Sequence, residues 1–299
     1  MKNNIINGCI DLHTHSTASD GTMTPSELAL HAKRAGLSAV ALTDHDTLSG
    51  LREFCSKCGE IGIEGIPGVE IGAKYKCEMH LLGLFVDYEN KEFYDILDDL
   101  AHARAERNRK MLQIMNEGGI DITEEDIISQ KETRDMNSCG RAHFAAALVK
   151  KGLAEDFGDA FDKYIGKGKP FYAARKAYPP NESIRLIKLG GGIAVLAHPM
   201  YITTDRDELR ALLTELKGYG LDGVECYYSQ YDNAFTQLCL ELCEELDLIP
   251  TGGSDFHAEN KPHIPIGIVG ENRGVPYEVL ERLKEYKKSN CRIGRRNGD

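Results

Sequence analysis

Six of the ten histidines stand in short segments that also contain or adjoin a carboxylate. Imidazole and carboxylate groups together are the ligands that bind divalent metal ions in hydrolases. This mixture favours a metal-dependent hydrolase over other classes of enzyme. The candidate metal ligands are His13, His15, Asp20, His45, Glu70, His80, His198, Asp255 and His257.

The pair His13 and His15 leaves a predicted strand, and alternate side chains of a strand share one face. Both imidazoles could therefore point at one ion, although such a pair alone is a weak signal. A carboxylate such as Glu70 can bridge two ions. Because no cysteine accompanies the clusters, hard or borderline ions suit them better than a thiolate-bound structural zinc. We favour manganese, with zinc or iron as alternatives.

Each cluster lies at the end of an apolar run, and helical segments separate many of these runs. Thr24, Pro25 and Glu27 predict a helix start that Gly36 ends, and a second helix is expected over 49–59. Alternating strands and helices predict a parallel sheet, and functional residues at many strand ends favour a TIM-like barrel. A doubly wound sheet is the alternative, but its site would lie at one switch point. The expected strands cover residues 9–13, 39–43, 64–71, 79–86, 192–197, 223–226 and 248–251.

Residues 91–174 interrupt this alternation with helical patterns over 94–115 and 141–151. We expect an α/β fold in which residues 1–90 and 175–299 form the barrel. The segment 91–174 is then a helical insertion domain that covers the barrel mouth.

The composition limits the function further. The chain has 299 residues, 41% of them hydrophobic, and no apolar run near the length of a membrane span. Its start lacks a secretory signal, which predicts a cytoplasmic protein. A net charge of −11 argues against binding long duplex nucleic acid, but residues 101–178 hold 14 Lys or Arg against 12 Asp or Glu. A small anionic substrate is compatible with that local balance.

The order of these motifs resembles the PHP (polymerase and histidinol phosphatase) superfamily of phosphoesterases, from about Gly8 to Lys287. The motifs are Asp-Leu-His13-Thr-His15, Leu-Thr-Asp44-His45-Asp46, Gly-Val-Glu70, Glu-x-His80-Leu-Leu-Gly, Ala-His198-Pro and Gly-Ser-Asp255-x-His257. The resemblance implies a distorted barrel of seven strands with two to three divalent ions. By motif matching, one ion takes His13, His15, Glu70 and Asp255, a second takes Glu70, His80 and His198, and a third takes Asp20, His45 and His257. The family often has histidine where Asp20 stands.

The insertion carries Gly140-Arg141-Ala142-His143 and Gly166-Lys167-Gly168-Lys169-Pro170. These runs are similar to the subgroup that includes 3′,5′-nucleoside bisphosphate phosphatases and nucleases that trim 5′-phosphorylated RNA. The resemblance implies hydrolysis of nucleotide phosphate monoesters by a hydroxide that bridges metal ions. The alternatives are a phosphatase for a small molecule such as histidinol phosphate, and a metal-stabilised scaffold without activity. The sequence indicates no oligomeric state.

Arginine offers paired donors to phosphate, so basic residues of this region are candidates for substrate binding. Arg141 is the first choice, and Arg104, Arg107, Lys169 and Arg175 are weaker ones. The predicted catalytic residues are Glu70, Asp255, His198 and Arg141.

Several neighbouring residues are predicted to support the site. We expect Asp44 to orient His45 or to lie just behind it, and Glu225 to support a ligand from its strand end. The aromatic residues Tyr227, Tyr228 and Tyr231 could pack the barrel rim or stack on a base.

Overall fold

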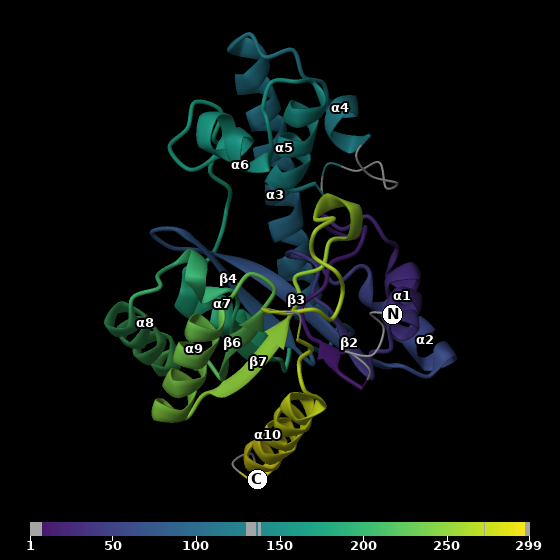
Figure 1. Ribbon diagram of the computed structural model, residues 1–299, viewed down its shortest axis with the longest axis vertical. Helices are drawn as coiled ribbons and strands as arrows, with labels where there is room; N and C mark the ends of the chain where they lie inside the picture. Colours follow the sequence, from purple (N-terminus) through teal and green to yellow (C-terminus); the bar gives the residue numbers. More distant parts are fainter. Residues whose placement is uncertain (1–7, 130–135, 137–138, 272, 297–299) are drawn as a thin grey trace.

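The computed structural model describes residues 8–129, 136, 139–271 and 273–296. Within these residues seven strands form one sheet, in which every strand is hydrogen-bonded to its neighbours in chain order (Figure 1). The strands are β1 (Ile10–Asp11), β2 (Ala39–Leu42), β3 (Glu64–Lys74), β4 (Glu78–Leu84), β5 (Ile193–Leu196), β6 (Gly223–Tyr228) and β7 (Ile249–Gly253).

The sequence predicts a parallel sheet, but the sheet is only partly parallel. Strand β4 runs antiparallel to both β3 and β5, whereas the other neighbouring pairs are parallel. β3 and β4 form a hairpin with Gly72 opposite His80. Because β4 is reversed, its beginning lies at the same end of the barrel as the ends of the parallel strands. His80 therefore reaches the site from the start of its strand.

The chain after β1 closes the barrel against β7. The amide of Leu12 donates to the carbonyl of Gly252 at 3.2 Å, and the amide of Asp255 donates to the carbonyl of His13 at 2.9 Å. Thr14 pairs with Phe256 in an isolated parallel bridge. The sheet is thus nearly closed, and it brings the first metal-ligand motif beside the last one.

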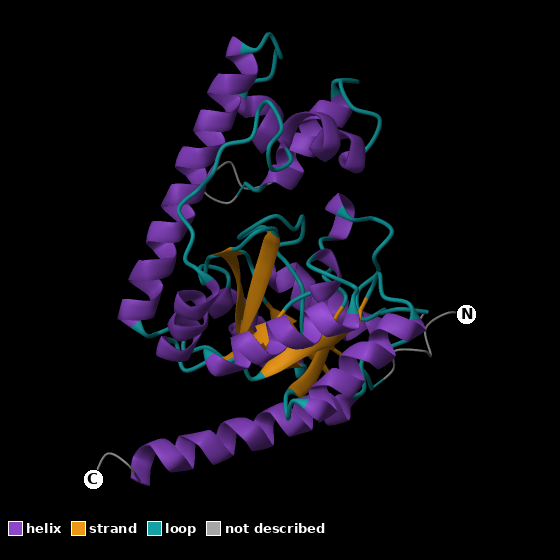
Figure 2. Ribbon diagram, turned by 90° about the vertical axis from the view of Figure 1, so that its left-hand side faces the viewer, coloured by secondary structure: helices purple, strands orange, loops and turns teal. Residues whose placement is uncertain are grey.

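Helices cover the outside of the barrel. The predicted capping box of Thr24 and Glu27 begins α1, and Gly36 ends it in a left-handed conformation, which its lack of a side chain permits. The second helix is two residues later than expected, over Leu51–Ile61. The outer helices are α1 (Pro25–Ala35), α2 (Leu51–Ile61), α7 (Pro180–Leu189), α8 (Arg206–Gly218) and α9 (Asn233–Glu245), with α10 (Tyr277–Arg296) at the bottom (Figures 1 and 2).

A helical segment, here called the cap, rises above one end of the barrel (Figure 1). The first turns of α3 pack on the barrel core through Phe93 and Leu97, and its later turns enter a separate core through Met111 and Met115. The boundaries 91 and 174 of an insertion domain stay a prediction. The cap comprises α3 (Lys91–Glu117), α4 (Glu124–Ile128), α5 (Arg141–Lys150), α6 (Phe157–Ala160) and η2 (Phe161–Ile165).

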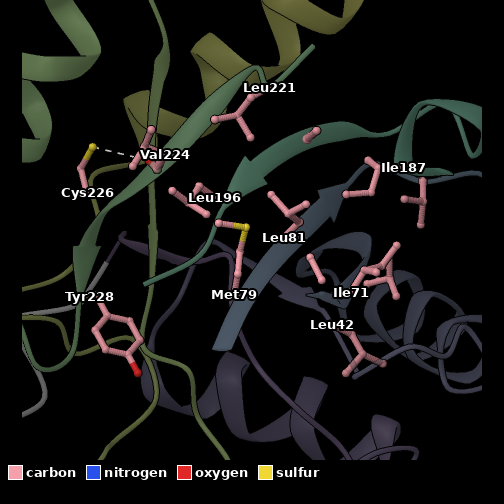
Figure 3. Close-up of a cluster of buried hydrophobic side chains, with 14 of the residues drawn as sticks. Leu42, Ile71, Met79, Leu81, Ile187, Leu196, Leu221, Val224, Cys226 and Tyr228 are labelled. Atoms are coloured by element: carbon pink, nitrogen blue, oxygen red, sulfur yellow. Dashed lines mark hydrogen bonds between the residues drawn. The ribbon is translucent and has the colours of Figure 1, made fainter. Parts of the chain in front are cut away.

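Two apolar clusters fill the barrel and its surround. Along β2, Ala39 and Ala41 belong to an inner cluster, while Val40 and Leu42 belong to an outer cluster under the helices. This alternation is what a barrel strand requires. The inner cluster also contains Leu280 of α10, so this helix packs against the inside residues of the strands. Figure 3 shows part of the outer cluster, with Leu42, Ile71, Leu81, Leu196 and Val224.

Among the helices of the described residues, none combines the length and the apolar character that crossing a bilayer demands.

Candidate metal centre

The carboxylate of Glu70 lies at the middle of the histidine cluster. Its Oε1 is 2.8 Å from Nδ1 of His80 and 3.0 Å from Nε2 of His198. Its Oε2 faces three more imidazoles, at 3.3 Å from Nε2 of His13, 3.2 Å from Nε2 of His15 and 3.0 Å from Nδ1 of His45. One buried carboxylate therefore contacts five histidines that are contributed by four separate segments.

Two further carboxylates complete the cluster. Oδ1 of Asp20 lies 3.2 Å from Nε2 of His257, and Oδ2 lies 3.6 Å from Nε2 of His45. Oδ1 of Asp255 lies 3.3 Å from Nε2 of His15. The structure thus brings all nine predicted metal ligands to one end of the barrel.

The donor atoms of this cluster fit divalent ions. Although they lie close to one another, four buried side-chain atoms of this cluster make no hydrogen bond to the described residues, namely Nε2 of His13, Nε2 of His15, Nδ1 of His45 and Oε2 of Glu70. Leaving a buried polar atom unpaired costs free energy, and native proteins rarely tolerate it. Here the four atoms converge, so ions held between them would satisfy all four at once.

The ligand atoms fall into three groups, each with its atoms within 4.8 Å of one another: His13, His15 and Glu70; His45, Glu70 and His80; and His15, Asp20, His45 and His257. These groups overlap with the three sets that the family resemblance implied but do not equal them. The first lacks Asp255, the second has His45 in place of His198, and the third contains His15 in addition. The assignment of ligands to particular ions stays a prediction.

Three residues at the site have a backbone conformation that side chains rarely adopt. The φ angles of Asp46, His198 and Asp255 are 54°, 28° and 59°. Such positive values for non-glycine residues persist where the surrounding structure enforces them, and they gather at functional sites. Each of these residues belongs to a predicted motif, and each directly follows or supplies a candidate ligand.

Side chains behind the ligands hold them in place. Oε1 of Glu225 lies 3.0 Å from Nδ1 of His13, and its Oε2 accepts from the amide of His198 at 2.8 Å. Nδ1 of His257 lies 2.8 Å from the carbonyl of Asp255. These contacts leave Nε2 of both rings for an ion, because a ligating histidine usually donates its other nitrogen to a carboxylate or carbonyl. The predicted supporting role of Glu225 agrees with this geometry.

One oxygen of Asp255 is fixed by two donors. The hydroxyl of Tyr228 and the ammonium of Lys261 donate to Oδ2 at 2.9 and 2.6 Å, so Oδ1 is left facing His15. Tyr228 is 1% exposed and Tyr231 is 3% exposed, so both are packed at this end of the barrel, although Tyr228 also lines the cavity described below.

Of the two roles predicted for Asp44, the described residues show no contact that would orient His45 and favour a position behind the ligands, since Asp44 accepts from Ser19, whose hydroxyl lies 3.4 Å from Nδ1 of His15. Asp44 also accepts from the amide and the hydroxyl of Ser16, at 2.8 and 2.6 Å. It therefore fixes the loop that follows His15. Sequence reasoning chose the nearer partner along the chain, whereas the barrel closure places the loop after β1 beside it.

Asp46 joins α3 and the chain that follows the cap to the barrel. Arg104 of α3 and Arg175 of the returning chain donate to its Oδ2, the latter at 2.7 Å. The amide of Gly72 donates to Oδ1 at 3.1 Å. A side chain at Gly72 would collide with the guanidinium of Arg175, so glycine is required for this approach. The charges of Arg175 and Arg104 outweigh burial and lower the pKa of Asp46.

The cluster concentrates negative charge. Burial raises the pKa of the Glu70 carboxyl, but neighbouring imidazoles including His45 and His80 lower it to well below its ordinary value. Burial lowers the pKa of His15, and Asp255 and Glu70 raise it to about 9. These carboxylates attract positive charge, and metal ions compete with protons for the same atoms. The potential of the site therefore suits cations.

A cavity of about 730 Å³ lies between this cluster and the cap. Its cationic wall includes Arg104, Arg107, Arg141, Arg175 and Lys261. Arg141 is packed over the rings of Phe161 and Tyr172, at 5.4 and 5.8 Å from their centroids. The predicted phosphate ligand Lys169 is exposed and does not line the cavity.

Sequence reasoning missed Lys261 and Tyr201. Both line the cavity, and each stands shortly after a ligand motif: Lys261 six residues after Asp255 and Tyr201 three residues after His198. The short distance to a motif was the available signal, but neither lies at a strand end.

Known proteins resemble this chain over most of its length. A family model described as "PHP domain" matches residues 11–172. A 5′-3′ exoribonuclease from Haemophilus influenzae is 33% identical over 248 residues, which cover 83% of this chain and 89% of the relative. A 3′,5′-nucleoside bisphosphate phosphatase from Chromobacterium violaceum is 30% identical over 259 residues, covering 86% and 90%.

A solved structure from Bifidobacterium adolescentis, described as a metal-dependent phosphoesterase, matches with a TM-score of 0.79 at 30% identity. The match covers 93% of this chain and 95% of the other. The relatives are hydrolases of phosphate esters, and the structural neighbour has the same barrel with its helices. This chain belongs to the PHP domain family and is a metal-dependent phosphoesterase.

Proposed function

We propose that this enzyme hydrolyses phosphate monoesters of nucleotides, either 3′,5′-nucleoside bisphosphates or 5′-phosphorylated short oligonucleotides. The observation that carries the proposal is the convergence of four unpaired buried ligand atoms at a cavity that is also lined by Arg104, Arg107, Arg141, Arg175 and Lys261. The names of the two relatives support the choice of a nucleotide. We also propose that the enzyme is cytoplasmic.

The cationic wall suits the charge of such a substrate. A phosphate monoester is doubly negative near neutral pH, and it must be neutralised before a nucleophile can approach phosphorus. Arg107 and Arg141 of the cap line the cavity, and Lys261 lines it beside Asp255 of the metal centre. Arginine can offer two parallel N–H donors to phosphate oxygens, which fixes orientation as well as charge. We assign phosphate binding to Arg141 first, with Arg104 and Arg175 as weaker candidates because Asp46 already engages them.

The nine predicted ligands would hold two to three divalent ions. Manganese is our first choice, with zinc or iron as alternatives, because the ligand set contains imidazole and carboxylate but no thiolate. When bound, such ions supply Lewis acidity that neutralises the phosphate and makes hydroxide accessible at neutral pH.

The residues of the chain prepare the site for this reaction. Glu225 keeps the proton of His13 on Nδ1, and the carbonyl of Asp255 does the same for His257. Glu70, Asp255 and His198 would hold the ions, with both oxygens of Glu70 and Oδ1 of Asp255 already facing the histidine cluster. Because these positions are fixed before substrate arrives, little reorganisation is needed during the reaction.

The test compares phosphate release from four substrates by the manganese-loaded enzyme. We expect faster release from a 3′,5′-nucleoside bisphosphate or a 5′-phosphorylated dinucleotide than from a mononucleotide or histidinol phosphate. The highest kcat/KM with histidinol phosphate would replace the proposal with a small-molecule phosphatase. Equal metal content but no release from any of the four would support a scaffold without activity.

A further inference from the structure

We propose that Tyr201, supported by Gln230, forms a platform on which the base of the substrate stacks beside the metal centre. The inference rests on the proposed function, since a base-bearing substrate is needed. It assigns a binding role to the wall of the cavity next to His198, whereas the phosphate-binding residues lie on the cap side.

Tyr201 stands one ring away from the metal ligands. It ends the short helix η3 (Pro199–Tyr201), which directly follows His198. The two ring centroids are 5.3 Å apart with planes at 64°. Nε2 of His198 in turn lies 3.0 Å from Glu70. Tyr201 therefore lies within reach of the sugar and base of a phosphate ester bound at Glu70.

The ring of Tyr201 is held in place although it is exposed. Its hydroxyl donates to Oε1 of Gln230 at 3.0 Å and lies 3.4 Å from the hydroxyl of Tyr228. The ring also contacts Tyr228 nearly edge to face, with centroids 6.2 Å apart at 85°. Nevertheless 48% of the residue is exposed, and it lines the cavity. An aromatic face that is already fixed loses little conformational entropy when a ligand packs on it.

The chemistry of the wall selects a base over a second charged group. Any nucleobase can stack on tyrosine, because every base presents a π face. The carboxylates of the metal centre and the neutral phenol and amide here would not attract a further phosphate. The ring of Phe161 on the cap is a weaker platform, since the guanidinium of Arg141 lies over it at 5.4 Å.

The kinetic test compares a nucleotide with a base-free ester such as ribose 5-phosphate. In Tyr201→Ala, kcat/KM for the nucleotide should fall about 5- to 160-fold, from a stacking energy of about 1–3 kcal/mol per base. The value for ribose 5-phosphate should not change. Tyr201→Phe keeps the ring and should stay within about twofold of wild type. Tyr219→Ala is a matched control, because Tyr219 is 45% exposed and hydrogen-bonded to Glu215 but does not line the cavity.

Equal losses for both esters in Tyr201→Ala, or no loss for either, would overturn the proposal. So would a loss of the preference for the nucleotide in Phe157→Ala with none in Tyr201→Ala, since Phe157 lines the cap side of the cavity.

A binding measurement separates this inference from the proposed function. The chain contains no tryptophan, so Tyr201→Trp places its single tryptophan on the platform, where it can be excited selectively over the tyrosines. We expect adenosine phosphates to quench this fluorescence in the presence of manganese, and ribose 5-phosphate and inorganic phosphate to leave it unchanged. If the enzyme released phosphate from no nucleotide, quenching by adenosine phosphates would still support the platform. Its absence would refute the platform whatever the hydrolysis assay showed.

Discussion

The barrel rim, which comprises the nine predicted metal ligands and the side chains that support them, lines the same cavity as the cap. The two regions contribute different side chains and hold them differently. On the rim, ligands such as His13 and Asp255 each have a second residue that fixes their orientation. On the cap, Arg141 contacts the faces of Phe161 and Tyr172. The rim is also held by the hydrogen bonds that close the sheet, while the cap has its own apolar core.

This difference separates the reaction from the choice of substrate. Rim side chains are buried, tightly positioned and suited to ions, so small changes there should affect catalysis with every substrate. Cap side chains supply positive charge to the cavity in which the substrate would bind, so changes there should affect the binding of particular substrates.

The largest effect is expected from removing a rim ligand. Asp255→Ala or His13→Ala should lose bound metal and reduce phosphate release to background, because the remaining donors no longer close the site. The far-ultraviolet circular dichroism should match that of the wild type. Metal content and phosphate release measure the effect, and the exposed His263→Ala is the matched control. Normal turnover in either ligand variant would remove the proposed metal centre.

Asp46→Asn tests the connection between rim and cap. Breaking a buried ion pair costs roughly 3 kcal/mol or more, so the free energy of unfolding in urea should fall by about 3 kcal/mol at pH 7. The pKa of Asp46 lies below its ordinary value of 3.8 in the folded protein. Its contribution is therefore complete above the unfolded pKa and is lost as pH falls through the folded pKa.

The difference between wild type and Asp46→Asn should thus be constant from pH 7 to about pH 5 and should narrow below about pH 4, following the ordinary pKa of aspartate. A difference that grew on acidification would contradict the assigned ion pairs.

Glu225→Gln tests whether orientation of a ligand matters as much as its presence. The amide would offer a donor or a weaker acceptor to Nδ1 of His13, which disturbs the proton position. Loss of such a supporting carboxylate typically costs 10- to 100-fold in metal affinity or activity. Titration with manganese and kcat at saturating metal measure the two effects. An unchanged metal affinity and kcat would show that His13 binds metal without the orienting contact from Glu225.

The smallest effect is expected on the cap. Arg141→Ala should raise KM for a nucleotide by roughly tenfold, since one charge-assisted hydrogen bond is worth about 1.5–3 kcal/mol and solvent offsets part of it. The value of kcat should change less. Lys169→Ala is the matched control, because Lys169 is exposed and away from the cavity, and it should stay within about twofold. An equal change in KM for Arg141→Ala and Lys169→Ala would contradict the assignment of substrate binding to the cap residue that lines the cavity.

Most of the rim could be predicted from the sequence, because strand ends were recognisable and the ligands stand directly after them. Asp44-His45-Asp46 and Ser254-Asp255-x-His257 follow short apolar runs. The reversal of β4 could not be predicted, since an apolar run has no direction. The one sign was that His80 stands at the start of its run and not at the end.

The partners of the ligands were harder to predict than the ligands. Asp44 contacts Ser16, 28 residues earlier, and Asp46 contacts Arg175, 129 residues later. These pairings depend on how the barrel closes and where the insertion returns, which no local pattern encodes. Tyr201 and Lys261 were missed because short irregular segments after a motif have no periodicity that assigns a direction to their side chains.

The continuity of α3 limits how the cavity can open. A helix of 27 residues is about 40 Å long and stiff, and this one is anchored at its base on the barrel and at its far end in the cap. Bending between the two parts would have to break the helix itself. Any motion of the cap against the barrel would therefore tilt the whole helix about its base and pull Arg104 away from Asp46. The ion pair between these two residues thus resists such a tilt and helps to set the shape of the cavity.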